Sequence, residues 1–195
     1  TALVGTVIRA RVPDTAVGER CRIQRDKMPE LEAEVIGFDE DRGVLLMPLG
    51  RCEGVSQDDP VLPCGARSSV PSGERVRGRV LNALGQPIDS LGLLPAGGQV
   101  DLLASPPNPL RRRRIAEPLS TGIRAIDGLL TIGRGQRVGI FAPAGGGKST
   151  LLAAIARHVR ADFVVLALIG ERGREVLPFI EDNLGVDGLA RSTVV

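Results

Sequence analysis

Hydrophobic and polar positions divide the chain into two parts with different periodicities. Over residues 1–72, short apolar runs alternate with polar positions, which predicts β-strands. The runs lie at residues 3–11, 21–24, 32–38 and 44–47. Turns rich in Asp, Gly and Pro separate them at residues 13–14, 39–43 and 58–60. Several short strands of this kind predict a small β-barrel or sandwich with a structural or assembly role, and a barrel is the fold that we expect.

A domain boundary is predicted by the sequence Val-Pro-Ser-Gly at residues 70–73. Proline and glycine together end regular structure, so the first domain is expected to span residues 1–72. The second domain then spans residues 73–195, where the composition and the periodicity change.

An extended connector is predicted within this second part. A strand-like run at residues 76–81 leads into the turn sequence Gly-Gln-Pro-Ile-Asp at residues 85–89. Residues 91–115 are rich in Gly, Pro and Leu, and they end in four consecutive arginines at residues 111–114. A basic run is able to bind phosphate or an anionic lipid headgroup, although a solvated surface is the commoner role of a run this short.

Strands and helices are expected to alternate from Ser120 onward. Helical spacing of apolar residues occurs at residues 121–130, 149–160 and 171–184. Apolar strands are predicted at residues 136–142 and 163–169, and a further strand begins at residues 192–195. Continuous apolar strands are typical of parallel sheets that are covered on both faces. The alternation therefore predicts parallel βαβ units and an α/β fold class.

The clearest chemical motif lies between the strand predicted at residues 136–142 and the helix that follows it. Residues 142–150 read Ala-Pro-Ala-Gly-Gly-Gly-Lys-Ser-Thr. The phosphate-binding loop pattern, GxxxxGK[ST], fits at seven of its eight positions, and Ala142 stands where the pattern has its first glycine. The strand-loop-helix context is the one that this pattern requires.

The chemistry of a bound triphosphate explains these residue types. Backbone N–H groups must turn inward toward the phosphates, and the start of a helix adds a positive dipole. Glycines adopt the backbone angles that such a loop needs. Lys148 would place a cation on the phosphates, and the Ser149 hydroxyl would bind Mg²⁺. The predicted nucleotide-binding residues are Ala144, Gly145, Gly146, Gly147, Lys148, Ser149 and Thr150.

A second group of candidate residues follows the apolar strand at residues 163–169. Glu171 and Arg172 come directly after Gly170, so they are expected at the same carboxyl edge of the sheet as the phosphate loop. A carboxylate at this edge is able to deprotonate an attacking water, and an arginine is able to contact the γ-phosphate. The residues alone leave Glu171 open between this role and a favourable place at a helix N-terminus. For Glu175 the helix-terminus interpretation is favoured.

Composition and charge narrow the function classes. The net charge is +2, and the chain has no Tyr and no Trp, so neither a strongly basic surface nor the usual stacking residues for nucleic acid are present. The apolar runs are too short to cross a bilayer. The three cysteines lack CxxC spacing and are interpreted as unreactive thiols, and His158 is interpreted as a structural or surface residue.

Two segments resemble the type III protein secretion ATPases, relatives of the flagellar export ATPase and the catalytic subunit of rotary ATP synthases. The segments are residues 135–152, which contain the loop, and residues 165–176, which contain Ile-Gly-Glu-Arg-Gly-Arg-Glu. In that family the first loop position is commonly Ala, which accounts for Ala142. Residues 85–89 and 117–123 also look like the family's approach to its nucleotide domain.

The resemblance implies an N-terminal β-barrel followed by a RecA-like P-loop domain. It implies a Mg²⁺-dependent ATPase that releases chaperones from export substrates and unfolds them, with Glu171, Lys148 and Arg172 as catalytic residues. It also implies a homohexamer with stalk and stator partners and bound chaperone–substrate complexes. The implied location is cytoplasmic, peripheral at the inner membrane, and nucleic acid is not an expected partner.

Three parts of the family's site do not occur in the sequence: the Mg²⁺-orienting aspartate, the arginine finger and the aromatic residue that stacks on adenine. We therefore expect a truncated nucleotide domain that is weakly active alone, because an arginine finger supplies about 10³ to 10⁵ in rate. A flagellar export ATPase is the nearest alternative. A non-catalytic subunit of a rotary ring is another, which the presence of Glu171 disfavours.

Overall fold

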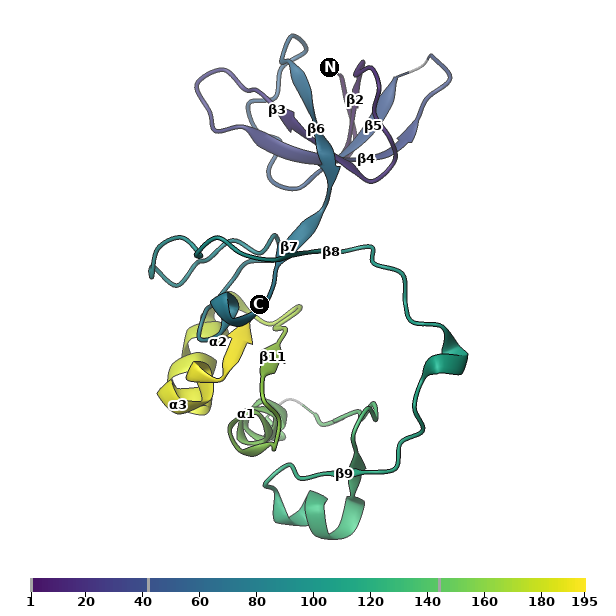
Figure 1. Ribbon diagram of the computed structural model, residues 1–195. Coiled ribbons are helices and arrows are strands. Elements are labelled where there is room, and N and C mark those ends of the chain that lie inside the picture. Colours follow the sequence, from purple (N-terminus) through teal and green to yellow (C-terminus); the bar gives the residue numbers. More distant parts are fainter. Residues whose placement is uncertain (1, 42, 144) are drawn as a thin grey trace. The chain divides into compact units, whose positions relative to one another are not determined.

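The computed structural model describes residues 2–41, 43–143 and 145–195 of the chain. It divides into two compact units (Figure 1). The first comprises residues 1–70 and 100–104, and the second comprises residues 71–99 and 105–195.

The first unit is built around one antiparallel sheet of six strands. The strands are β1 (Ala2–Val4), β2 (Val7–Ala10), β3 (Glu19–Ile23), β4 (Leu31–Phe38), β5 (Val44–Pro48) and β6 (Val61–Arg67). Their order across the sheet is β1-β2-β5-β4-β3-β6. Alternate residues of β4 are buried, as the alternating sequence predicts, and they join a core that includes Ile8, Ile23 and Leu46.

The strand predictions for this unit are confirmed with two corrections. Residues 3–11 form a hairpin, β1 and β2, instead of one strand, and Gly5 supplies the positive φ of 62° at its turn. The strand β6 was not predicted, because Pro63 and Gly65 interrupt its apolar pattern. The recorded pairings make an open sheet with β1 and β6 at its edges, so the closed barrel is not confirmed.

The cysteines lie in this unit as free thiols. Cys21 is fully buried in the core of the sheet, Cys52 is partly buried and Cys64 is exposed. Burial raises the pKa of the Cys21 thiol to about 11, so this side chain is a neutral apolar group at physiological pH.

The second unit has both helices and strands. Its short strands are β9 (Pro118–Leu119), β10 (Ile132–Gly133), β11 (Val164–Leu166) and β12 (Ser192–Val194). Its helices are α1 (Lys148–His158), α2 (Gly173–Pro178) and α3 (Gly185–Ala190), with π-helical turns at Ile126–Leu130 and Phe179–Leu184 and 3-10 turns at Glu74–Val76 and Pro109–Arg111. The strands β7 (Ser69–Pro71) and β8 (Gln99–Asp101) pair where the chain passes between the units.

The predicted parallel βαβ arrangement is confirmed for β11 and β12. These strands pair in parallel, with Val164 opposite Ser192, and the helical segments between them pack with α1. Ala153 and Ala156 of α1 share a buried core with Phe179 and Leu184. The strand β12 is buried at all three positions, as expected for a strand covered on both faces.

Two predicted strands of the second unit are wrong. Residues 136–142 make no ladder among the described residues, and Val138 and Phe141 are exposed. A strand needs a neighbour for its N–H and C=O groups, and none of the described strands takes that place. Residues 76–81 form no continuous strand: Val80 makes a parallel bridge to Val194, and Leu81 makes an antiparallel bridge to Pro87.

Candidate functional site

The phosphate-loop sequence leads directly into α1. Gly145 and Gly147 both have a φ of 79°, a left-handed conformation that favours glycine, and Gly147 precedes the first residue of the helix. The N–H of Gly146 donates to the carbonyl of Pro143 at 3.0 Å, which closes the turn. A Cβ on Gly146 would lie 2.9 Å from the Cβ of Ala142, so this position is too tight for a side chain.

The start of α1 is suited to hold an anion. The first turn of any α-helix leaves N–H groups without intrahelical acceptors, and the helix dipole makes this end positive. Lys148 is the first residue of α1, followed by Ser149 and Thr150. The last turn contains Arg157 and His158, which are favourable at the negative end of the helix.

A cleft of about 540 Å³ lies in front of this loop. Its walls are residues 142–143, 145–150, 170–172 and 175. Every predicted site residue is therefore on one cleft, except Ala144, which lies outside the described residues. The cleft combines backbone N–H groups, one lysine, one arginine, hydroxyl groups and two carboxylates.

The two residues with the clearest chemistry meet in this cleft. The Nζ of Lys148 lies 3.6 Å from an Oε1 of Glu171, although 23 positions separate them in the sequence. Both side chains are partly exposed, so the pair itself adds little stability. The position of this pair matters more for function than for stability, because the carboxylate and the lysine both line the open cleft at the start of α1.

Arg172 and Glu175 form a second ion pair on the cleft wall. An Nη1 of Arg172 lies 3.3 Å from an Oε1 of Glu175, and both side chains remain accessible. Glu175 also lies in the first turn of α2, as the sequence predicts. The prediction was nevertheless incomplete, because Glu175 belongs to the cleft as well.

A divalent cation fits the donor set of this cleft. Among the described residues, no group of three or more His, Cys, Asp or Glu side chains is placed to hold a metal by itself. Mg²⁺ at a nucleotide site usually has only one or two protein ligands, and phosphates and waters supply the others. The Ser149 hydroxyl and the carboxylates of Glu171 and Glu175 provide hard oxygen donors of this kind.

A smaller cleft of about 250 Å³ adjoins the first on the side of α2. The two clefts share Ser149, Glu171 and Glu175, and the smaller one is also lined by Leu168 and Phe179. Glu171 therefore lies between the open cleft at the loop and a smaller cleft with both polar and apolar walls.

The far end of α1 is fixed by contacts that the sequence did not predict. The Arg191 guanidinium donates to the carbonyls of Arg157 at 3.1 Å, Val159 at 2.8 Å and Ala161. These carbonyls lie at and just after the end of α1 and would otherwise lack intrahelical donors. Arg191 comes directly before β12, so this contact joins the helix to the sheet.

A turn at residues 120–122 supports the same helix end. The N–H of Arg160 donates to the carbonyl of Ser120, and a Cβ on Gly122 would lie 2.4 Å from the Cβ of His158. Asp127 holds this turn by accepting hydrogen bonds from Ser120, Thr121 and Gly122, and the bonds from Thr121 contribute most to a lowered pKa of Asp127.

A buried ion pair joins the turn at residues 85–89 to the strand-like segment before it. Two nitrogens of Arg79 donate to the two carboxylate oxygens of Asp89, at 2.7 and 2.9 Å. Both side chains are about nine-tenths buried. The Arg79 guanidinium, helped by the N–H groups of Val80 and Leu91, holds the pKa of Asp89 far below its usual range.

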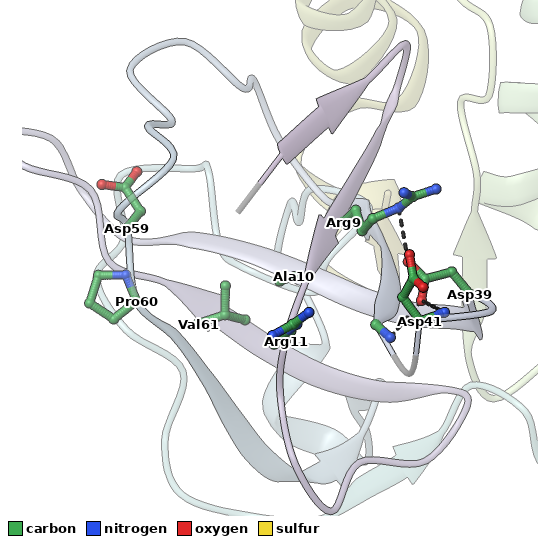
Figure 2. Close-up of a pocket in the computed structure, with 9 residues that line it drawn as sticks. Arg9, Ala10, Arg11, Asp39, Asp41, Asp59, Pro60 and Val61 are labelled. Atoms are coloured by element: carbon green, nitrogen blue, oxygen red, sulfur yellow. Dashed lines mark hydrogen bonds and ion pairs between the residues drawn. The ribbon is translucent and has the colours of Figure 1, made fainter.

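The first unit has a cleft of its own, of about 430 Å³ (Figure 2). Arg9 and Arg11 of this cleft come from β2 and the segment after it, and Asp39 comes from the turn between β4 and β5. Arg9 already pairs with Asp39 at 2.9 Å, and Asp39 accepts from the N–H groups of Asp41 and Gly43. Arg9 is therefore already neutralised by a carboxylate and is not held free for a phosphate.

Comparison with known proteins finds one family model in the second unit. Residues 122–195 match the nucleotide-binding domain of the ATP synthase alpha/beta family. The matched range includes every residue that lines the cleft in front of α1.

Curated relatives match the chain from end to end. A type 3 secretion system ATPase of Xanthomonas euvesicatoria is 47% identical over 194 residues, which is 99% of this chain and 44% of the relative. A flagellum-specific ATP synthase of Pseudomonas aeruginosa is 44% identical over 196 residues, covering 99% of this chain and 43% of the relative.

A solved structure matches with a TM-score of 0.87 at 39% identity. It is the assembled ATPase EscN in complex with its central stalk EscO, from the type III secretion system of enteropathogenic E. coli. The match covers all of this chain and 47% of that one, so the chain spans less than half the length of the relatives that it matches. Within the described residues, no helix has the length and apolar character needed to cross a membrane.

Proposed function

We propose, on the premise that the chain belongs to the family of type III secretion ATPases and flagellum-specific ATP synthases, that its second unit binds and hydrolyses Mg·ATP. One observation supports this most strongly. The glycine loop at the start of α1, Lys148 and Glu171 line a single cleft, and the lysine and the carboxylate lie 3.6 Å apart.

Each residue then has a role that follows from its chemistry. The N–H groups of Gly145 to Gly147 and the start of α1 bind the phosphates. Lys148 exchanges its contact with Glu171 for the β- and γ-phosphates, which leaves the carboxylate free to accept a proton from the attacking water. Arg172 contacts the γ-phosphate.

Ser149 is the protein ligand that we assign to Mg²⁺, and the ion, when bound, neutralises charge on the phosphates. The carboxylates of Glu171 and Glu175 lie on the same cleft and orient water around the site. Thr150 and Gly147 complete the loop at the first turn of α1.

At the level of the whole protein we propose a type III secretion ATPase. Hydrolysis would release chaperones from export substrates and unfold those substrates. EscN has been solved as an assembled ATPase and with a central stalk, which supports a homohexamer with a stalk partner. Stator proteins and chaperone–substrate complexes are further proposed partners, and the proposed location is the cytoplasmic face of the inner membrane.

The domain assignment is also a proposal. We assign residues 1–72 to a β-barrel assembly domain and residues 73–195 to the first part of a RecA-like domain. The antiparallel sheet of six strands supports the first assignment, and the parallel pair β11 and β12 beside α1 supports the second.

Two alternative functions remain distinct from this one. A flagellar export ATPase has the same chemistry, and the flagellum-specific relatives at about the same identity favour it to a similar degree. A non-catalytic subunit of a rotary ring would bind nucleotide without hydrolysing it, and the placement of Glu171 against the loop argues for a catalytic site.

Single-turnover hydrolysis of ATP by excess protein tests the proposal, because it detects even slow chemistry. The variants are Glu171→Gln and the matched control Glu181→Gln, whose exposed side chain is not on the cleft. Glu171→Gln is expected to bind Mg·ATP while its rate falls by about 10² to 10⁴, the usual contribution of a general base. The control should keep the wild-type rate. An unchanged rate in Glu171→Gln would refute the base assignment and favour the non-catalytic alternative.

A further inference from the structure

The four consecutive arginines at residues 111–114 lie on an extended, exposed part of the second unit. The 3-10 turn Pro109–Arg111 is the only regular element between residues 105 and 117 within the part of the chain that the structure describes (Figure 1). Arg112 after it has an extended backbone, with a φ of −71° and a ψ of 128°. All four arginine side chains are exposed.

The positive charge of this segment is not neutralised by the chain itself. No carboxylate among the described residues pairs with any of these four guanidinium groups. Eight arginines elsewhere in the described residues do pair with a carboxylate. Those with ion pairs are Arg9, Arg20, Arg22, Arg77, Arg79, Arg134, Arg172 and Arg174.

An exposed apolar residue adjoins the cluster. Leu110 has 94% of its surface exposed and comes directly before Arg111. At the other end Ile115 lies against Gly133 of β10, where its Cγ2 would be 2.2 Å from an added Cβ. The segment is thus held in place at Ile115 and presents a leucine and four cations to solvent. Binding at a membrane surface uses the same combination of apolar burial and electrostatic attraction.

We propose that residues 110–114 bind the anionic headgroups of a lipid bilayer. Arg112 has backbone angles near those of a polyproline II helix, in which three residues complete a turn, so neighbouring guanidinium groups turn away from one another and do not form one shaped surface for a rigid protein groove. A bilayer adapts to such a segment, and long arginine side chains reach the headgroup plane from either side. Residues 110–114 would then be the part of the chain that holds it at the membrane in the proposed peripheral location, and lipid binding would not require ATP hydrolysis.

The expected strength follows from the number of charges. Each basic residue near an anionic surface strengthens binding by about fivefold, so four of them contribute on the order of a thousandfold. The attraction is screened by salt, because the screening length falls from about 10 Å at 0.1 M to about 3 Å at 1 M.

Vesicle sedimentation of the 195-residue chain tests the proposal. The vesicles are phosphatidylcholine with and without phosphatidylglycerol. The cluster variant carries glutamine at positions 111–114. A matched control carries glutamine in place of Arg51, Arg67, Arg124 and Arg137, which are also exposed, so both variants lose four charges. Circular dichroism checks that both are folded, and binding of a fluorescent ATP analogue is measured separately.

We expect salt-sensitive binding to vesicles that contain phosphatidylglycerol. The cluster variant should lose affinity on the order of a thousandfold, and the control should lose far less. Equal losses in both variants would show that net charge alone acts, and an unchanged cluster variant would exclude the segment. Competition by millimolar phosphate would indicate an ordinary anion site. Binding to polyglutamate but not to vesicles would indicate an acidic protein partner, and both of these results would overturn the proposal. A wild type that binds vesicles but does not bind the ATP analogue would contradict the proposed function and leave the lipid proposal intact.

Discussion

Replacing Asp89 by Asn is expected to destabilise the second unit strongly. The two oxygens of Asp89 accept from Arg79 at 2.7 and 2.9 Å, and from the N–H groups of Val80 and Leu91 at 3.0 Å each. Asparagine keeps one acceptor, but it puts an NH₂ group against donors and leaves the buried guanidinium without its counter-charge. Loss of one charge-assisted hydrogen bond costs about 1.5–3 kcal/mol, and breaking a fully buried pair costs about 3–5 kcal/mol. We therefore expect a loss of about 3 kcal/mol.

The effect should depend on pH with a defined sign. The pKa of Asp89 is lowered in the folded chain, so the carboxylate stabilises the fold above the unfolded-state pKa of about 3.9. This contribution is lost as the pH falls from there through the lower, folded-state pKa. The difference in stability between wild type and Asp89→Asn should therefore be large near about pH 6 and should shrink near about pH 2.

Urea unfolding followed by far-UV circular dichroism measures this difference, because the chain has no Trp or Tyr to report by fluorescence. Hydrogen exchange of the Leu81 N–H, which donates to the carbonyl of Val194, and of the Val194 N–H, which donates to the carbonyl of Arg79, assigns the change to the second unit. Asp182→Asn, at an exposed position, serves as the matched control. Equal unfolding midpoints for Asp89→Asn and Asp182→Asn would refute the reasoning, as would a stability difference that does not change with pH.

Three further predictions concern α1 and its two ends. Gly147→Ala should weaken binding of a fluorescent ATP analogue about tenfold, because alanine costs about 1–2 kcal/mol at a φ of 79°; unchanged affinity would contradict a preorganised loop. Arg191→Ala should lower the unfolding free energy by about 1.5–3 kcal/mol and speed amide exchange at the end of α1, and unaltered exchange there would show that the carbonyl contacts are unimportant. Gly122→Ala should lower the thermal midpoint, since its Cβ would meet that of His158 at 2.4 Å and its φ is 78°; Gly128→Ala, with open space around it, is the control, and equal midpoints would contradict the packing argument.

The site was more predictable from the sequence than the sheets were. Local rules specify a phosphate loop, because the glycines, Lys148 and Ser149 are adjacent in the chain and open a helix. The proximity of Glu171 followed from a general rule of parallel sheets, that ligands lie at the carboxyl ends of strands. The 3.6 Å contact with Lys148 agrees with that expectation.

The remaining features depend on long-range contacts that periodicity does not encode. Residues 136–142 have the apolar sequence of a strand, yet strand formation requires a paired neighbour as well as propensity. The strand β6 is the opposite case. Pro63 and Gly65 interrupt its apolar pattern, but these residues still form a strand because they pair with β3. The sequence predicts Asp89 only as part of a turn, and its contact with Arg79 becomes apparent only in the folded chain.

The central claim is that the cleft in front of α1 holds the phosphates of ATP, and equilibrium binding of a fluorescent ATP analogue with Mg²⁺ tests it most directly. Wild type, Lys148→Ala and the control Lys27→Ala, at an exposed position far along the sequence from the cleft, are titrated in parallel. The wild type and the control should bind saturably, and Lys148→Ala should bind at least tenfold more weakly, because a charged contact to phosphate contributes about 1.5–3 kcal/mol. Equal affinity in all three, with folded circular dichroism spectra, would contradict the assignment of residues 145–149 as the phosphate site.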